Sequence, residues 1–391
     1  MNFSVATLGE LSLGDGKYGI AASAVDYDAK LPAYLRITDI NDDGTLNWND
    51  RKSVNDSDAY KYMLSEGDIV FARTGNSTGR NYYYDPRDGA FAFAGFLICF
   101  SLDDRKVNPR YIKYYAQSKA YWDWVASFNT GSTRGNINAK TYAQLPIPLP
   151  DRSTQDSIVM LCDSISNKIR LNAKLNGYLE ELGKAIWRKA IETSGTSACI
   201  GDIAAEIVTG KTPSTKVPEY YGDKYPFITI PDMHSNVWLC STERRISETG
   251  NRAQPKKLVP RGAVLVSCIA TLGLVGIVQK PSHFNQQINA VVPASEGDEF
   301  FLYYAMRSIT QALLGIGATG SATLNVNKSA FSQIEIPWLE GKAMAGFVQT
   351  VRPIFETIEA NSIESLRLRK LSDSLLPKLM SGEIDVSKVM F

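Results

Sequence analysis

The sequence repeats itself at a fixed distance, and this repeat restricts the possible folds more than any other feature. The polar segment Thr130–Asn138, TGSTRGNIN, returns as Thr319–Asn327, TGSATLNVN, at an offset of 189 (319 − 130). Further matches at this offset are Gln144–Pro148 with Gln333–Pro337 and Tyr114–Ala116 with Tyr303–Ala305. A constant offset indicates a duplicated structural unit, and this period is far too long for a solenoid repeat. We therefore expect two copies of a whole domain, each with the same appendage.

The appendage is predicted to be one long helix. Residues 153–191 contain no proline, and their apolar residues recur every three or four positions. The same spacing returns over residues 343–380. An apolar stripe on so long a helix needs a partner, and the chain contains two such stripes. We expect the two helices to pack on each other; the alternative is that each folds back onto its own domain.

The expected fold class is α+β, with two α/β domains separated by two long antiparallel coiled-coil helices and an internal pseudo-twofold duplication. The predicted divisions are residues 1–150 and 193–339 for the domains, 151–192 for the central helix, and 340–391 for the C-terminal helix and tail. Within the domains we expect strands over 67–73, 90–102 and 262–268 and helices over 108–128 and 301–314. Three prolines between Pro146 and Pro150 are expected to end the first domain.

Two asparagines interrupt the apolar stripes at matching places. Asn172 and Asn361 each lie near the midpoint of a predicted helix. In an antiparallel pair the midpoints meet, so we expect the two side chains to lie close together. A buried polar pair can fix the register of a helix pair at a cost in stability.

Charge and composition exclude several kinds of site. The net charge is +1, so a nucleic-acid surface must be a local patch. The five cysteines show no CxxC spacing and are interpreted as buried thiols of a cytoplasmic protein. Neither His234 nor His283 has a second soft ligand nearby in sequence, so no metal is expected. We also expect no signal peptide and no membrane span.

Several signatures of nucleotide-binding and methyltransferase sites are incomplete or missing in the sequence. The stretch Ala205–Thr212, AEIVTGKT, approaches a phosphate-binding loop but begins with alanine and is followed by Pro213 instead of a helix. No Gly-x-Gly-x-x-Gly follows a predicted strand, and no adenine-methyltransferase tetrapeptide occurs in the sequence. The chain is therefore not expected to be an enzyme by itself.

Polar loops punctuated by glycine are the candidate binding elements. Arginine can bind guanine with two hydrogen bonds, asparagine can bind adenine, and serine and threonine suit phosphates. An ordinary surface hairpin has a similar composition, and this interpretation stays open. The candidate DNA-binding residues are Arg73, Thr74, Asn76, Ser77, Thr78, Arg80, Ser132, Thr133, Arg134, Lys211, Thr212, Ser214, Thr271, Ser321 and Thr323.

One segment resembles a known family. Thr209–Met233, TGKTPSTKVPEYYGDKYPFITIPDM, is similar to the opening of a target recognition domain from the specificity subunit of type I restriction–modification systems. The matching features are the Thr-Pro-Ser turn, a strand at Pro226–Ile228 and the acid Asp232. The entry to the first long helix and the C-terminal stretch Leu375–Val386 resemble the two spacer regions of that family. The opening of the first domain, Asp15–Tyr27, departs from the pattern.

The resemblance implies a subunit that reads double-stranded DNA and does not catalyse. Each domain would read one half of a bipartite target, and the helices would fix the gap and dock two methyltransferase subunits. Those partners would bind S-adenosylmethionine and methylate adenine at N6, whereas this chain would bind no cofactor. Restriction and translocase subunits would join for cleavage. The alternatives are a methyltransferase with an unrecognised active site and a coiled-coil scaffold protein.

Overall fold

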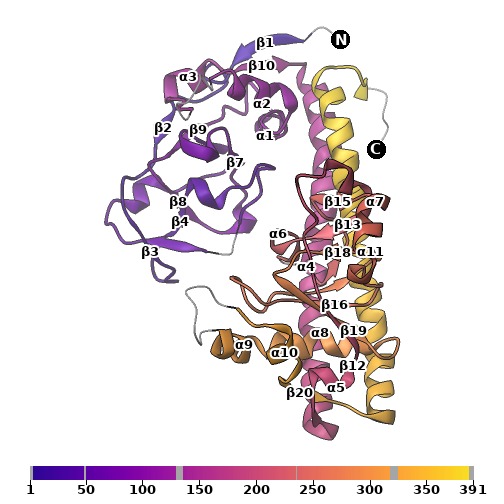
Figure 1. Ribbon diagram of the computed structural model, residues 1–391. Helices are drawn as coiled ribbons and strands as arrows, with labels where there is room; N and C mark the ends of the chain where they lie inside the picture. The colour runs from indigo at the N-terminus through magenta and orange to yellow at the C-terminus, as the bar shows by residue number, and fades with distance from the viewer. Residues whose placement is uncertain (1–2, 48–49, 129–134, 235, 318–324, 387–391) are drawn as a thin grey trace. The chain divides into compact units, whose positions relative to one another are not determined.

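The chain folds into two compact units. The computed structural model describes residues 3–47, 50–128, 135–234, 236–317 and 325–386. Residues 1–167 and 369–391 form the first unit, and residues 168–368 form the second. Both long helices, α4 (Arg152–Ser194) and α11 (Gly341–Met380), cross from one unit to the other, so each unit contains a segment of each helix (Figure 1).

The globular part of the first unit combines short sheets with small helices. One sheet has the order β2-β9-β6-β7 and is antiparallel; a second has the order β3-β5-β4-β8, in which β4 and β8 run parallel. A third, two-stranded sheet pairs β1 with β10. The strands are β1 (Ser4–Thr7), β2 (Lys17–Tyr18), β3 (Ala24–Asp26), β4 (Ala33–Leu35), β5 (Lys52–Val54), β6 (Asp68–Ala72), β7 (Asn81–Tyr83), β8 (Phe91–Phe93), β9 (Leu97–Ser101) and β10 (Pro146–Leu149). The helices are α1 (Pro109–Tyr115), α2 (Lys119–Ala126) and α3 (Ala139–Ala143), with 3-10 turns η1 (Ile37–Asp39), η2 (Ala59–Tyr62), η3 (Gly75–Ser77) and η4 (Pro86–Asp88).

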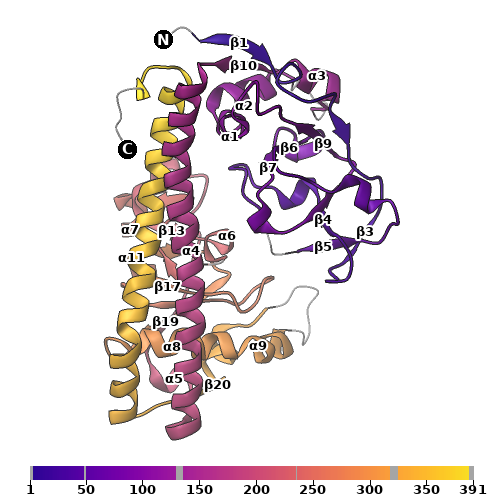
Figure 2. The same ribbon diagram turned by 180° about the vertical axis from the view of Figure 1, so that it is seen from behind.

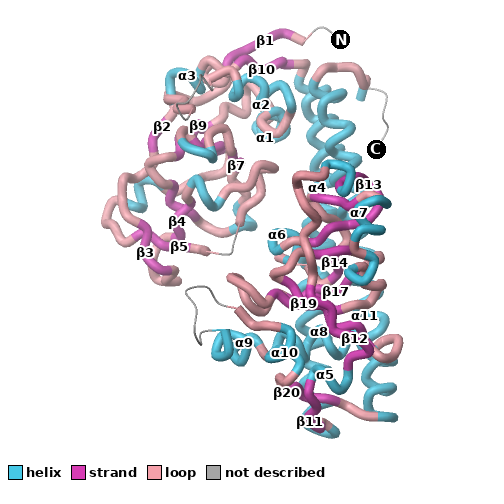
Figure 3. The backbone as a smooth tube through the Cα atoms, viewed as in Figure 1, coloured by secondary structure: helices cyan, strands magenta, loops and turns pink. Residues whose placement is uncertain are grey.

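The globular part of the second unit also combines sheets with small helices (Figure 3). Its sheets have the orders β12-β19-β16-β17-β14, β15-β13-β18 and β11-β20. The strands are β11 (Thr196–Cys199), β12 (Ala204–Thr209), β13 (Tyr221–Ile228), β14 (Trp238–Leu239), β15 (Arg244–Ile246), β16 (Val264–Ser267), β17 (Val275–Val278), β18 (His283–Phe284), β19 (Ile288–Pro293) and β20 (Glu335–Trp338). The helices are α5 (Ile200–Ile203), α6 (Ile230–Met233), α7 (Glu248–Ala253), α8 (Asp298–Ser308), α9 (Thr310–Gly317) and α10 (Lys328–Ser332), with η5 (Pro218–Tyr220) and η6 (Pro255–Lys257).

Matching residues build matching elements in the two units. Asn138 caps α3 by accepting a hydrogen bond from the backbone N–H of Thr141, and Asn327 caps α10 in the same way. The strands that follow, β10 and β20, pair antiparallel with β1 and β11, the strands that open the two globular parts. The sequence duplication is therefore a duplication of structure.

Aromatic side chains hold the helices of the first unit against its sheet. Phe71 of β6 stacks on Tyr142 of α3, with ring centroids 4.9 Å apart. The buried hydroxyl of Tyr142 donates to the carbonyl of Ala72 at 2.9 Å, and that of Tyr121 donates to the carbonyl of Gly79 at 2.5 Å. Because the carbonyl of Ala72 ends β6 and that of Gly79 lies in the turn that follows, these bonds fix the turn to the core.

In the second unit, α4 and α11 lie side by side and antiparallel (Figures 1 and 2). Asn172, which is 2 % exposed, donates from Nδ2 to the backbone oxygen of Asn361 at 3.3 Å and to Glu364 at 2.8 Å. Asn361 in turn donates from Nδ2 to Oδ1 of Asn176 at 2.8 Å. The structure thus brings the two asparagines together through a polar network.

The helices also form part of the globular core of the second unit. On the sequence alone, packing between the helices and packing onto the domains are alternatives. Phe355 of α11 stacks on Phe300 of α8 at 4.7 Å, and its carbonyl accepts a hydrogen bond from the indole of Trp238. Trp187 of α4 packs against Phe301. In the second unit, therefore, helix–helix packing and packing onto the domain occur together.

Several local predictions were wrong. The apolar run 90–102 is two strands, β8 and β9, because the chain turns at Gly95 between them. The predicted helix 108–128 is α1 and α2, and helix 301–314 is likewise broken between α8 and α9. The prolines at 146, 148 and 150 stand where the strands of the first globular part end: β10 contains Pro146 and Pro148 and pairs with β1, and α4 begins at Arg152. All five cysteines are free, but Cys199 and Cys240 are only half-buried.

Candidate nucleic-acid interface

The same backbone turn follows β6 in the first unit and β16 in the second. In the first, the N–H of Gly79 donates to the carbonyl of Ala72, and the N–H of Ala72 donates to the carbonyl of Arg80. In the second, Gly273, Ser267 and Leu274 form the corresponding pair of bonds. Each turn therefore offers one framework on which different side chains are displayed.

The two turns also share a left-handed residue. Gly75 has a φ of 74°, a conformation that glycine adopts without steric cost. Ala270, in the corresponding place, has a φ of 64° and is the only non-glycine residue with positive φ in the described chain. This conformation costs an alanine roughly 1–2 kcal/mol, so the turn is kept despite local strain.

Arg73 begins the turn of the first unit and is half-buried. Its guanidinium lies over the ring of Tyr18 at 5.1 Å and over that of Phe96 at 5.9 Å. The Nε–H of Arg73 is buried and has no hydrogen-bond partner among the described residues. Tyr18 and Phe96 are 43 % and 55 % exposed, so one arginine and two aromatic rings form a surface cluster here.

The small polar residues of the same loop differ in what they can reach. Asn76 is exposed, whereas Ser77 is buried. Thr74 forms a β-bridge with Asn136, and the hydroxyl of Thr78 donates to the carbonyls of Gly75 and Gly135. Of these side chains, Asn76 is the one left open to a ligand, while Thr78 holds the loop in shape.

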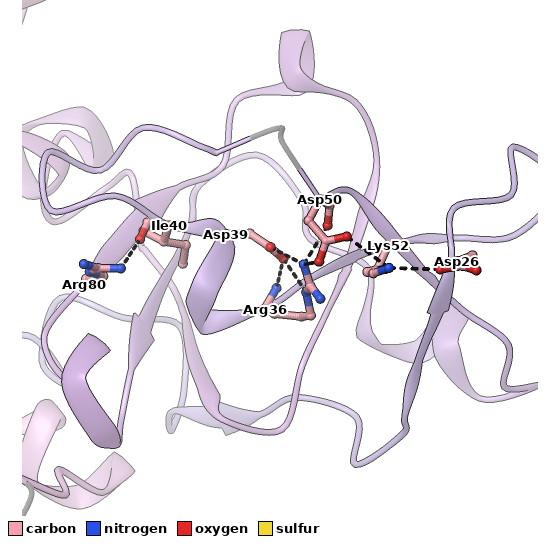
Figure 4. Close-up of polar contacts among 7 residues, drawn as sticks. All are labelled: Asp26, Arg36, Asp39, Ile40, Asp50, Lys52 and Arg80. Atoms are coloured by element: carbon pink, nitrogen blue, oxygen red, sulfur yellow. Dashed lines mark hydrogen bonds and ion pairs between the residues drawn. The ribbon is translucent and has the colours of Figure 1, made fainter. Parts of the chain in front are cut away.

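Arg80 closes the turn and is held by a second loop. Its Nε donates to Oδ1 of Asp42 at 2.7 Å, and its Nη1 donates to the carbonyl of Ile40 at 3.1 Å (Figure 4 shows the contact with Ile40). Two of the three sequence-predicted arginines, Arg73 and Arg80, therefore lie on one turn, each fixed by a different neighbour.

The repeated TGS loops fall largely outside the described residues. This applies to the predicted residues Ser132, Thr133, Arg134, Ser321 and Thr323. The segments that follow both loops are described. The N–H of Ile137 donates to the carbonyl of Arg73, and the N–H of Val326 donates to that of Cys268, both at 2.9 Å. In each unit, the chain leaving the TGS loop therefore runs against the turn after the central strand.

In the second unit, a short segment that the sequence analysis did not single out connects the two loops that carry the predicted residues Lys211, Thr212, Ser214 and Thr271. Thr212 donates from its hydroxyl to Oε1 of Gln286 at 2.5 Å, and the N–H of Lys211 donates to the carbonyl of Phe284. The N–H of Cys268 donates to the carbonyl of Gln287 at 2.7 Å. The segment 284–287 thus connects the Lys211–Ser214 loop to the turn that carries Thr271, and Lys211, Ser214 and Thr271 are exposed.

Gln286 and Gln287 are candidates that the sequence reading missed. Their side-chain amides suit adenine, which presents one donor and one acceptor in the major groove. Gln287 occupies the place that Phe96 holds in the first unit, because the N–H of Arg73 donates to the carbonyl of Phe96. The amide-rich run Asn285–Gln287 was the available signal.

The two candidate surfaces therefore differ in chemistry on a shared framework. The first presents Arg73, Arg80 and exposed aromatic rings, and the second presents threonine, lysine and glutamine side chains. In the described ranges, no group of three or more histidine, cysteine or acidic residues is placed to hold a metal ion. Nor does any helix in those ranges combine the length and apolarity of a membrane span.

Comparison with known proteins decides the family. A profile described as the type I restriction modification DNA specificity domain matches residues 26–181 and again residues 196–365. The chain belongs to this family. The two matches follow the two repeated parts of the sequence, and the resemblance noted from Thr209–Met233 is confirmed. Chains of the type I specificity family recognise DNA sequence within restriction–modification systems, and this is the function of the present chain.

Individual relatives extend over most of the specificity chain. The HindI specificity subunit of Haemophilus influenzae is 28 % identical over 405 residues, covering 83 % of this chain and 88 % of the relative. The StySPI specificity subunit of Salmonella potsdam is 22 % identical over 362 residues, covering 82 % and 75 %. The crystal structure of the type I S subunit from M. genitalium superposes with a TM-score of 0.58 at 15 % identity, covering 97 % and 96 % of the two chains. That likeness supports the predicted fold class.

Proposed function

We propose that each globular domain reads one half of a bipartite DNA target and that the chain itself performs no catalysis. The observation that carries this proposal is the shared turn after β6 and β16, which displays different side chains in the two units. Phosphate contacts set position, while base contacts carry the sequence information. Two different sets of donors on equivalent frameworks are suited to two different half-sites.

In the first unit, the donors favour guanine and the DNA backbone. Arg73 and Arg80 lie on one turn, and the N–H of Ile137 donates to the carbonyl of Arg73. The predicted residues Ser132, Thr133 and Arg134 lie outside the described residues. In the second unit, Thr212, Lys211 and Gln286 lie together. Amide and hydroxyl side chains there favour adenine contacts and phosphate contacts.

The long helices are proposed to set the gap and to dock the methyltransferase subunits. Four side chains of α4 follow helical spacing and remain exposed: Leu171, Leu175, Tyr178 and Leu182 are 58 %, 40 %, 63 % and 51 % exposed. Residues separated by three and four positions lie on one face of a helix. This stripe supports a helix-binding surface for a partner protein.

The chemistry would belong to the partners. Two methyltransferase subunits would bind S-adenosylmethionine and methylate adenine at N6 in the cytoplasm, with restriction and translocase subunits joining for cleavage. To reach its target atom, such an enzyme must take the base out of the stack. The absence of an adenine-methyltransferase tetrapeptide from the sequence supports the division of labour.

Methylation mapping tests the proposal. The host genome would be sequenced for modified adenine with the complete complex present and with this chain deleted. We expect one interrupted, asymmetric motif that disappears on deletion. Labelled methyl transfer to DNA by the purified chain alone would contradict the proposed division of labour.

A further inference from the structure

The place of Arg80 in the fold does not require an arginine. The second unit builds the same turn with Leu274 at the corresponding position, and the backbone bond from Ser267 to Leu274 matches that from Ala72 to Arg80. The turn therefore forms without a charged side chain. What Arg80 contributes must come from its guanidinium.

That guanidinium is held at two of its three nitrogens. Nε donates to Asp42 and Nη1 donates to the carbonyl of Ile40, so two of the five N–H donors are in use. The guanidinium has no other partner within the described part of the chain. The side chain of Arg80 is 28 % exposed and that of Asp42 is 76 % exposed. The remaining N–H groups can therefore meet a ligand in a fixed orientation.

The loop that supplies Asp42 and Ile40 is itself tied down. Residues 39–50 follow the spacing of a calcium-binding loop, Asp-x-Asn-x-Asp-Gly-x5, although the last position is Asp50 instead of glutamate. Here a guanidinium pairs with the first and last carboxylates: Nη2 of Arg36 lies 2.6 Å from Asp39 and 3.3 Å from Asp50 (Figure 4). Lys52 adds a second cation, 3.0 Å from Asp50.

The centre of this loop is also fixed. Ile40 is fully buried and forms a bridge with Leu46, and the hydroxyl and N–H of Thr45 both donate to Asp43. These contacts fix the conformation of the loop, and Asp42 projects from it toward Arg80.

We infer that Arg80 reads a guanine and that Asp42 is the residue that positions it. Guanine presents N7 and O6 side by side in the major groove, and an arginine satisfies both with two N–H groups. A carboxylate at Nε restricts the rotation of the guanidinium, so less conformational entropy is lost on binding. Asp42 also repels phosphate, which disfavours a simple backbone contact at this place. The inference rests on the proposed function and names one specificity-determining pair within it.

The test uses the chain assembled with its methyltransferase partner and short duplexes that carry the mapped target. Each base pair of both half-sites is changed in turn, and relative methylation rates are measured. The variants are Arg80→Ala, Arg80→Lys, Asp42→Asn and the double variant Asp42→Asn with Arg80→Ala. The matched control is Asp58→Asn, which removes the same charge from a carboxylate that pairs with Lys61.

We expect Arg80→Ala to lower discrimination for a guanine at one position by about 5- to 150-fold, the range of one bidentate contact. Asp42→Asn should lower discrimination at that same position while binding to random-sequence duplex is unchanged or tighter. The double variant should equal Arg80→Ala alone, because Asp42 acts through Arg80. Arg80→Lys keeps the charge and should also lose the preference, and Asp58→Asn should behave as the unmodified chain.

Two results would overturn the inference. Equal weakening of all duplexes by Arg80→Ala, with a flatter salt dependence, would make Arg80 a phosphate contact. Unchanged base preference in Asp42→Asn and Arg80→Lys, with thermal midpoints near that of the unmodified complex, would make the pair structural only. If the unmodified complex shows no half-site preference at all, the proposed function fails along with the inference.

Discussion

At the scale of single residues, Ala270 is the clearest target for stabilisation. It keeps a φ of 64° where the matching turn has Gly75. Ala270→Gly should raise the free energy of unfolding by about 1 kcal/mol, because removal of the Cβ relieves more strain than the added flexibility costs. Chemical denaturation measures the change, with Gly75→Ala as the matched variant of opposite expected sign. A less stable Ala270→Gly protein would contradict the reasoning.

His283 should make the second unit sensitive to acid. The ring is fully buried, with Nε2 2.9 Å from Oδ1 of Asn251, and burial lowers its pKa to about 4 from 6.5. Because the unfolded chain binds the proton more tightly, the stabilisation is fully present above pH 6.5 and is lost as the pH falls toward 4, by at most about 1.4 kcal/mol per pH unit.

Unfolding measured at several pH values between 6.5 and 4 tests this. In His283→Gln that component of the pH dependence should be absent, even though the variant is less stable at neutral pH. An equally steep loss of stability in this variant would assign the acid sensitivity to other groups. His234, which is exposed, gives a matched control when changed to glutamine.

The turn regions of the two units show which candidate site residues could be predicted from the sequence and which could not. Arg73 and Arg80 could be proposed because Arg73 ends a predicted strand and Arg80 lies in the glycine-rich loop that follows it. Asp42 could not, because it meets Arg80 across 38 positions and only the fold brings them together. The same holds for Gln286, which meets Thr212 across 74 positions.

At the scale of elements, the paired asparagines of α4 and α11 are a test of helix register. Replacing Asn172 and Asn361 together with leucine should stabilise the helix pair by about 1 kcal/mol, since the amides of the buried Asn172 and the half-buried Asn361 are exchanged for apolar packing. The same change should broaden the range of accepted gaps between half-sites. Thermal unfolding and methylation of targets with altered gaps measure the two effects. A single preferred gap in the double variant would show that register is set elsewhere.

The exposed stripe on α4 gives a second prediction for an element. Leu171→Lys combined with Tyr178→Glu should reduce copurification of the methyltransferase at least tenfold, because charge is placed in an apolar contact. Ala173→Lys, at an exposed position of the same helix between them, is the control and should retain binding. Full binding by the first variant would move the docking surface away from the stripe.

The sequence predicted the long helices well and the short elements poorly, for a physical reason. An apolar period sustained over many turns is a strong signal, so 153–191 and 343–380 come close to α4 and α11. The breaks between α1 and α2 and between α8 and α9 carry no proline. Those breaks are set by packing in the fold, which local pattern does not report.

At the scale of the whole molecule, recognition of the two half-sites by the two domains should be separable. Replacing residues 1–150 with the first domain of another family member should change one half-site and leave the other intact. The reason is that each unit has its own core and its own turn. Methylation mapping of the hybrid measures both halves, and the reciprocal exchange of residues 193–339 is the control. A simultaneous change in both halves would contradict independent reading.

The small sheets β1-β10 and β11-β20 have a consequence for inheritance. Ser4 pairs with Leu149 and Thr196 pairs with Trp338, so the first and last residues of each globular part lie on neighbouring strands. A recombination crossover in the gene segment that encodes α4 would therefore join a foreign first domain to the resident second domain. Both strand pairs, β1-β10 and β11-β20, would stay intact. A lineage with this architecture can acquire a new target in one recombination event. Point mutations would instead have to alter the base contacts one at a time. The intermediate proteins would direct methylation to neither the old target sequence nor the new one.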